Sequence, residues 1–305
     1  MTETRTAVVL MGYGTPRTPD DILPYYTDIR RGNPPSPQQL EELTARYAAI
    51  GGISPLAERS DAQRQEMQAA LDRIADGQYH VVLGMKHAAP FIEDSVDELA
   101  RQGFHRAVGL VLAPHYSAFS VGQYLDRLRS AAASHDIVVH QIRSWATEPA
   151  LIDFIAADVR ARLAELPQPT RVLFTAHSLP QRILEAGDPY PAELLATAEC
   201  VATACELDNW GVAWQSAGRT PEPWLGPDIL QVIDELAADG QTRGVLVSAV
   251  GFVADHLEVL YDLDIEASRR ATTHGLAFAR TRCVNDDTTV MTALAHRVID
   301  AVGTT

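Results

Sequence analysis

The sequence has few cysteines and no long apolar run. Its three cysteines, Cys200, Cys205 and Cys283, lack the paired spacing and the fourth ligand that zinc and iron–sulfur sites usually need. They fit small buried residues in a reducing compartment. No run approaches the roughly 18 apolar residues of a membrane-spanning helix, and the run at 7–11 is too short for a signal-peptide core. We therefore expect a cytoplasmic protein without a transmembrane segment.

Positive charge is also scarce. The chain has 25 lysines and arginines against 40 aspartates and glutamates, so its net charge is −15. A nucleic-acid partner is not expected, because neutralising phosphates needs a basic surface. An anionic substrate would have to be held by local arginines against the overall negative field. The 305 residues, 46% of them apolar, are enough for two domains with substantial cores.

Short apolar runs rich in β-branched residues recur along the chain, and helical patterns separate most of them. Apolar residues at helical spacing occur, for example, at 151–163, 229–236 and 290–298. Strands that alternate with helices predict parallel sheets covered on both faces. The eight predicted strands lie near residues 6–11, 80–85, 107–113, 137–142, 171–176, 211–215, 244–250 and 276–280.

The second half of the chain repeats the order of the first. The segment 8–13 resembles 172–177, and 91–99 resembles 226–236, in the same order along four strands. We predict two similar α/β domains, at 1–147 and 148–305, each with a doubly wound, four-stranded parallel sheet. The last helix of the second domain could pack against the first domain.

A histidine and a carboxylate follow two of the predicted buried strands. His177 opens the tetrapeptide His177-Ser178-Leu179-Pro180 after the apolar run 172–174, and Glu258 follows the run 245–247. Side chains just past the ends of parallel strands can meet in one cleft. An imidazole there could accept a proton or bind a metal near neutral pH. A serine nucleophile is not expected, because Ser178 lacks the Gly-x-Ser-x-Gly elbow.

Two further segments allow two interpretations each. Glu258, Asp262 and Glu266 recur every four residues and would form a carboxylate stripe on a helix. The stripe is either a solvated acidic face or a site for divalent cations and proton relay. The segment 20–57, inserted after the first strand, combines aromatics with arginines. It is either an ordinary surface loop or a clamp for a flat anionic ligand.

Six segments with distinctive motifs follow one another from the first strand to about Glu266. They lie at 12–16, 25–32, 51–56, 177–180, 224–227 and 255–258. Together and in this order they resemble the ferrochelatase family. The similarity is greatest to the short, soluble enzymes of Gram-positive bacteria that insert ferrous iron into coproporphyrin III to form coprohaem. It implies a type II chelatase-like fold of two Rossmann-like domains with the active-site cleft between them, and a porphyrin-contacting insert at about 20–57.

The resemblance also implies roles for individual residues. His177 and Glu258 are the catalytic pair and the metal site on one porphyrin face. Tyr13 approaches the metal from the opposite face. Asp262 and Glu266 continue an acidic path for metal or protons. Contacts to the macrocycle and its propionates fall to Tyr13, Arg30, Arg46, Tyr47, Ser54 and Tyr124.

In this interpretation ferrous iron is a substrate, and no tightly bound cofactor is expected. The [2Fe–2S] cluster of some actinobacterial relatives needs four cysteines and is not expected here. We expect a monomer that binds porphyrin and iron and transiently contacts neighbouring haem-pathway enzymes. The alternatives are a protoporphyrin IX ferrochelatase, a cobalt or nickel tetrapyrrole chelatase, and a non-catalytic tetrapyrrole carrier. A carrier would need no proton acceptor, so His177 and Glu258 argue against it.

Overall fold

The computed structural model describes residues 5–218 and 220–303, and these form two four-stranded sheets. Residues 1–4, 219 and 304–305, which include both outer limits of the predicted domains, lie outside the described residues. No helix in the described part is long and apolar enough to cross a membrane. The strands are β1 (Thr6–Gly12), β2 (Tyr79–Met85), β3 (Arg106–Val111), β4 (Val138–Ile142), β5 (Thr170–His177), β6 (Trp210–Gln215), β7 (Gly244–Ser248) and β8 (Ala277–Arg280).

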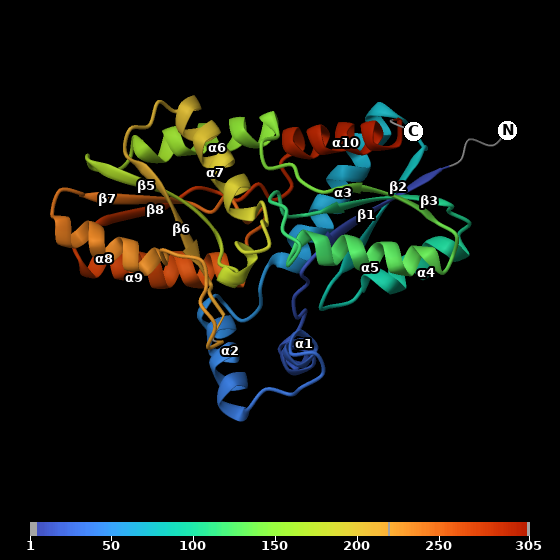
Figure 1. Cartoon of the computed structure of the whole chain (residues 1–305), viewed down its shortest axis with the longest axis horizontal. Coiled ribbons are helices and arrows are strands. Elements are labelled where there is room, and N and C mark those ends of the chain that lie inside the picture. Colours follow the sequence, from blue (N-terminus) through green and yellow to red (C-terminus); the bar gives the residue numbers. More distant parts are fainter. Residues whose placement is uncertain (1–4, 219, 304–305) are drawn as a thin grey trace.

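The two sheets have the same topology. Their strand orders are β2-β1-β3-β4 and β6-β5-β7-β8, and every neighbouring pair is parallel. Each of the eight predicted strands is present. The strands read as continuous apolar runs because helices cover both faces of each sheet, as Figure 1 shows. The prediction of a doubly wound α/β fold built from two similar halves is confirmed.

The helices on one face of the sheets share a single core. This face carries α3 (Leu56–Ile74), α6 (Pro149–Leu163), α7 (Tyr190–Ala204) and α10 (Thr288–Gly303). Their buried residues form one cluster with residues of both sheets, including Leu10 of β1 and Phe174 of β5. The final helix, α10, packs against α3 and β4 of the first half and against α6 of the second. This shared core ties the two halves together.

The opposite face has a separate core under each sheet. The helices α4 (Ile92–Arg101) and α5 (Val121–Ala133) cover the first sheet. The second sheet is covered by α8 (Ile229–Asp239), a helix η3 (Val259–Ala267) and α9 (Ser268–Thr273). Among the described residues, the two halves therefore share no apolar cluster on this face.

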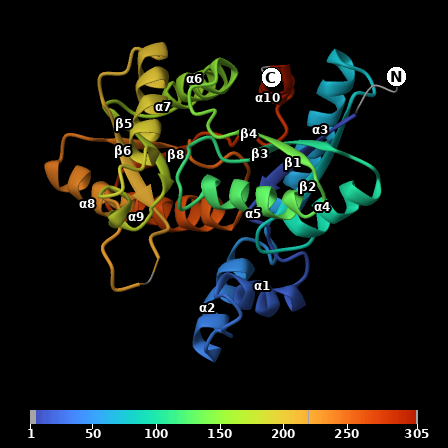
Figure 2. The same cartoon turned by 45° about the vertical axis from the view of Figure 1, so that its right-hand side comes forward.

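The insert after β1 forms helices that project from the body of the molecule. It contains the short turn η1 (Pro19–Asp21), α1 (Ile22–Ile29) and α2 (Pro37–Ala49), and α1 and α2 extend below the sheets in Figures 1 and 2. Ser36 caps α2, because its hydroxyl accepts from the Gln39 amide while the Gln39 side chain accepts from the Ser36 amide. Pro37 then suits the first helical turn.

Candidate active site

The two predicted metal-facing residues occupy equivalent places in the two halves. Tyr13 follows the last residue of β1, and His177 is the last residue of β5. β1 and β5 hold the same position in their sheets. The carboxyl ends of such strands are where ligands bind in α/β sheets. The structural repeat therefore supplies one residue from each half to the same kind of position.

His177 and Glu258 form a pair, with Nε2 of His177 3.5 Å from Oε1 of Glu258. Each side chain is about one-third exposed. Nδ1 of His177 contacts the Ser178 carbonyl. The other oxygen of Glu258, Oε2, lies 3.7 Å from Nε2 of His256, and Nδ1 of His256 is bonded to the Ala254 carbonyl at 2.9 Å. The carboxylate thus lies between two imidazoles, and the Nδ1 atom of each ring is bonded to a backbone carbonyl, which orients the ring.

The pair is ionised near neutral pH. Burial lowers the pKa of His177, but the Glu258 carboxylate and hydrogen bonds to Glu258 and Ser178 outweigh it and raise that pKa to about 9. Burial raises the pKa of Glu258, but the charge of His177 outweighs it and holds that pKa well below its usual range. Both ring nitrogens of His177 then donate, one to Glu258 and one to Ser178.

The charge of Glu258 also reaches tyrosines of the first half. Burial raises the pKa of Tyr13, Tyr47 and Tyr124, and the Glu258 carboxylate raises each further. Tyr47 and Tyr124 are almost fully buried, whereas Tyr13 is 42% exposed. The structure therefore brings the predicted tyrosines of the first half and Glu258 of the second into one electrostatic environment.

Two further predicted porphyrin contacts, Ser54 and Arg30, make their described contacts with nearby residues of the insert. Ser54 is buried, and its hydroxyl accepts from the Leu56 amide at 3.2 Å. Arg30 is partly exposed and makes its described contacts within its own segment, to the Asn33 carbonyl and the Tyr26 ring. It is not in contact with the His177–Glu258 pair in this structure.

Arg46 contacts the acidic stripe. Its Nη2 lies 3.2 Å from Oδ1 of Asp262 and 3.6 Å from Oε2 of Glu266, and its guanidinium stacks over Tyr261. This ion pairing was not anticipated from the sequence. It joins α2 of the insert to the segment that follows Glu258.

The helix that carries the stripe is a π-helix, not the α-helix on which the spacing argument rested. Glu258 immediately precedes η3, where the hydrogen bonds run from residue i to i+5. The common contact with Arg46 shows that Asp262 and Glu266 remain on one side. Burial and then Glu258 raise the pKa of Asp262 to about 6, against the lowering effect of its hydrogen bond from Ser216 and of Arg46. Asp262 is therefore able to exchange protons near neutral pH.

A glycine lets the segment before Glu258 approach β5. The Gly251 amide donates to the Thr175 carbonyl at 3.0 Å. A Cβ at Gly251 would lie 2.5 Å from Cβ and 2.7 Å from Cα of Ala176, the residue before His177. Neither clash can be relieved by rotating a side chain, because Ala176 has none to rotate.

Gly251→Ala is therefore expected to push the Glu258 segment away from His177. We expect a loss of about 1–3 kcal/mol in unfolding free energy, as for overpacking in a core, together with a lower pKa of His177, because Glu258 would lie farther from it. Thermal unfolding and an NMR titration of the His177 ring would measure the two effects. Gly303→Ala is the matched control, because a Cβ there meets nothing within 4 Å. Equal stability and an equal His177 pKa in the two variants would contradict the proposed packing constraint.

The loop that carries Trp224 is fastened to the residues after His177. Ser178 is buried, and its hydroxyl donates to the Leu225 carbonyl at 2.8 Å, while the Leu225 amide donates to the Leu179 carbonyl at 2.9 Å. Trp224 Nε1 donates to Thr220 Oγ1 at 3.0 Å. Arg219 of the same loop lies outside the described residues. Ser178 thus holds the Trp224 loop next to the residues that follow His177.

Three residues near the site were not assigned roles from the sequence. His256 contacts Glu258, and His87 lies against the Tyr13 ring at 4.6 Å and bonds Asp28 at 2.7 Å. Lys86 is the only lysine of the chain, lies over the Tyr124 ring, and has a pKa lowered to about 8, mainly by burial. His256 belongs to the His-x-Glu pattern with Glu258, and Lys86 and His87 directly follow a predicted strand. These positions are the sequence signals that could have placed the three residues near the site.

Comparison with known proteins gives a family and a fold. The family model described as "Ferrochelatase" matches residues 5–302. The "Ferrochelatase" of Herpetosiphon aurantiacus is 45% identical and aligns with 93% of this chain and 94% of its own. The "Coproporphyrin III ferrochelatase" of Geobacillus kaustophilus is 41% identical, covering 98% of this chain and 96% of its own.

Among solved structures, SirB from Bacillus subtilis with Fe³⁺ superposes with a TM-score of 0.58 at 12% identity, covering 97% of this chain and 95% of that one. The sirohydrochlorin chelatase SirB from Bacillus subtilis subspecies spizizenii, in complex with cobalt, gives the same TM-score at 11% identity, over 98% and 96% of the two chains. At such low identity these two matches establish the fold alone. The family match over nearly the whole chain shows that this protein belongs to the ferrochelatase family.

Proposed function

We propose that this protein inserts ferrous iron into coproporphyrin III, forming coprohaem, as a metal chelatase (a lyase) of haem biosynthesis. The observation that carries the proposal is the ionised His177–Glu258 pair, whose charge reaches Tyr13 of the other half, in a chain of the ferrochelatase family. Relatives from Geobacillus kaustophilus and Oceanobacillus iheyensis, 41% and 40% identical over nearly their full lengths, carry the name coproporphyrin III ferrochelatase.

The reaction requires ring deformation, removal of two pyrrole protons and delivery of a divalent ion. A planar free-base porphyrin hides its nitrogen lone pairs, so the site must bend the ring. Binding of the remote propionates would supply the strain energy, roughly a few kcal/mol. Buried Tyr47, Tyr124 and Ser54 offer hydroxyl groups in the first half, and Arg30 offers a partly exposed guanidinium. Tyr13 would approach the iron from the face opposite His177.

The ionised pair suggests an order of proton movements. His177 already holds a proton in the resting state because Glu258 stabilises it. Arrival of ferrous iron at Glu258 would offset that negative charge and lower the pKa of His177, which would then release its proton. Neutral His177 could next accept the two pyrrole protons, one after the other. Asp262, with a pKa of about 6, would carry each proton outward toward Glu266.

The remaining features of the proposal follow the same chemistry. Ferrous iron and the porphyrin are substrates, and we propose no resident cofactor. The three cysteines are free thiols in the described chain. The expectation that they are buried is correct for Cys283 and wrong for Cys200, which is exposed, while Cys205 is partly buried. We propose a cytoplasmic monomer whose contacts with neighbouring haem-pathway enzymes are transient.

The test is anaerobic insertion of ferrous iron, followed by absorbance, with coproporphyrin III and protoporphyrin IX assayed in parallel. We expect fast turnover of coproporphyrin III and little of protoporphyrin IX. Preference for protoporphyrin IX would retain the chelatase mechanism and overturn the proposed substrate. Tight binding of both rings without insertion of iron, cobalt or nickel would overturn the enzyme and favour a tetrapyrrole carrier.

A further inference from the structure

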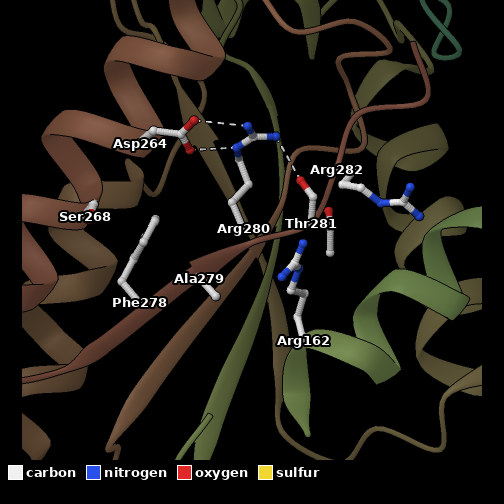
Figure 3. A pocket seen from close by; sticks show the side chains of 8 residues that line it. All are labelled: Arg162, Asp264, Ser268, Phe278, Ala279, Arg280, Thr281 and Arg282. Carbon is white, nitrogen blue, oxygen red and sulfur yellow. Dashed lines mark hydrogen bonds and ion pairs between the residues drawn. The ribbon is translucent and has the colours of Figure 1, made fainter. Parts of the chain in front are cut away.

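Two residues outside the proposed site form ion pairs and hydrogen bonds with the segment that carries Glu258. The first is Arg280, at the end of β8. Its guanidinium forms a two-pronged ion pair with Asp264 on η3, with Nε 2.7 Å from Oδ1 and Nη2 3.0 Å from Oδ2 (Figure 3). Nη1 donates to the Thr281 carbonyl at 2.8 Å, which fixes the plane of the fork. Arginine supplies this geometry and lysine does not.

The same guanidinium also contacts a residue that precedes Glu258 in the chain. Nη2 of Arg280 lies 3.3 Å from Oδ1 of Asp255. Asp255 precedes Glu258 by three residues, and Asp264 follows it by six. The Arg280 side chain is only 14% exposed and lines a surface pocket of about 360 Å³ that contains none of the proposed site residues. One largely buried cation therefore spans the segment on which Glu258 lies.

The second residue is Asn285, which completes the contacts of Asp255. Asn285 Nδ2 donates to Asp255 Oδ2 at 2.9 Å, and the Asp255 amide donates to Asn285 Oδ1 at 3.0 Å. The backbone of Asn285 is left-handed, with φ of 48°, a conformation that asparagine tolerates better than most residues. Its carbonyl accepts from Gln63 Nε2 of α3 at 2.9 Å. A continuous set of bonds thus runs from the first half of the molecule to η3.

The negative charge of the segment 255–266 explains why it needs a cation such as Arg280. Residues 255–266 carry five carboxylates and no lysine or arginine. His177 and His256 face Glu258, and Arg46 faces Asp262 and Glu266. Asp255 and Asp264 depend on Arg280. Without it, the two carboxylates would repel the rest of the segment, and η3 would be free to shift relative to β5.

We propose that Arg280, together with Asn285, is a positioning residue that fixes Glu258 at its working distance from His177. This inference rests on the proposed iron insertion, because it assigns a role to residues that touch neither substrate. Residues that orient metal-site side chains in this way typically affect metal affinity or activity by about 10- to 100-fold.

The test compares Arg280→Lys with Arg282→Lys, anaerobically, in the full-length protein with ferrous iron and coproporphyrin III. Arg282 lines the same pocket but pairs with Asp158 of α6, at 2.9 Å, rather than with η3. We expect Arg280→Lys to lower kcat and raise the KM for iron, with a combined loss of about 10- to 100-fold. The KM for the porphyrin should stay within about threefold, and Arg282→Lys within about twofold of the parent on every constant.

A double variant separates positioning from general damage. Arg280→Gln leaves Asp264 without its cation, whereas Arg280→Gln combined with Asp264→Asn leaves a neutral pair. We expect the double variant to recover part of the kcat lost in the single one, which unrelated damage at two sites would not do. No recovery would overturn the positioning role.

Asn285→Gly tests the same set of hydrogen bonds at a second residue. Glycine keeps the left-handed backbone and removes both side-chain bonds to Asp255. If Arg280→Lys does not fold, this variant must show the same loss of kcat with an unchanged porphyrin KM. Parent-like kinetics in the folded variants would overturn the proposal, whereas a parent protein that inserts no iron would overturn the proposed function instead.

Discussion

Glu258→Gln is expected to abolish iron insertion while porphyrin binding stays intact. Glutamine keeps the size of the side chain and removes the negative charge that faces His177 and His256. The site then loses its proposed anionic oxygen ligand for ferrous iron, and His177 loses the carboxylate that raises its pKa. We expect kcat to fall by about 10² to 10⁴, the usual range for a positioned proton-transfer group. Fluorescence quenching of coproporphyrin III should give a Kd within about threefold of the parent value.

A surface variant provides the control for this experiment. Glu235→Gln makes the same chemical change on α8, where the carboxylate is exposed and bonded only to Gln231 among its described contacts. It should behave like the parent in both assays. Equal loss of porphyrin binding and insertion in Glu258→Gln would contradict the role assigned to Glu258, because a ligand of the metal should not be needed to hold the ring.

His177→Ala is expected to reduce insertion as severely, again by about 10² to 10⁴ in kcat. The variant removes the proposed proton acceptor. It also removes the positive charge that lowers the pKa of Glu258, so burial would then raise that pKa and weaken the carboxylate as a ligand. Added imidazole should restore part of the rate if the lost group acts as a base. His135→Ala is the control, because His135 forms a comparable pair with Asp97 on the surface.

The same pair predicts a pH dependence whose direction can be checked. With a pKa of about 9, His177 is protonated at neutral pH, and raising the pH releases the proton that competes with iron. The kcat/KM for iron should therefore rise between about pH 7 and 9. In Glu258→Gln the main cause of the high pKa is gone, burial lowers it, and the midpoint should move to lower pH. NMR titration of the His177 ring in the metal-free protein would measure both values, and identical midpoints would contradict the electrostatic coupling.

The fold was largely predictable because it depends on local patterns. Eight short apolar runs, separated by helical periodicity, predict parallel strands whatever their order. The similarity of 8–13 to 172–177 indicated the repeat, and the structure places Tyr13 and His177 at its equivalent ends. Strand order itself, and the single core that α10 shares with α3 and α6, depend on contacts between distant segments that no local pattern encodes.

The site was predictable only in part, for the same reason. His177 and Glu258 were found because both follow buried strands, and strand ends converge. The π-helix was not predicted, because its residues also satisfy an α-helical reading of the spacing. The ion pair of Arg46 with Asp262, and the bond from Asn285 to Asp255, join segments far apart in the sequence. Their partners can be read only from the folded chain.

The most direct test of this account is a crystal structure of the protein with coproporphyrin III and, separately, with its iron product. The account predicts a ring held between the two halves, with His177 and Glu258 on one face and Tyr13 on the other. In the product, the iron should lie within bonding distance of the Tyr13 oxygen. A ring bound elsewhere, or one with His177 and Tyr13 on the same face, would contradict it.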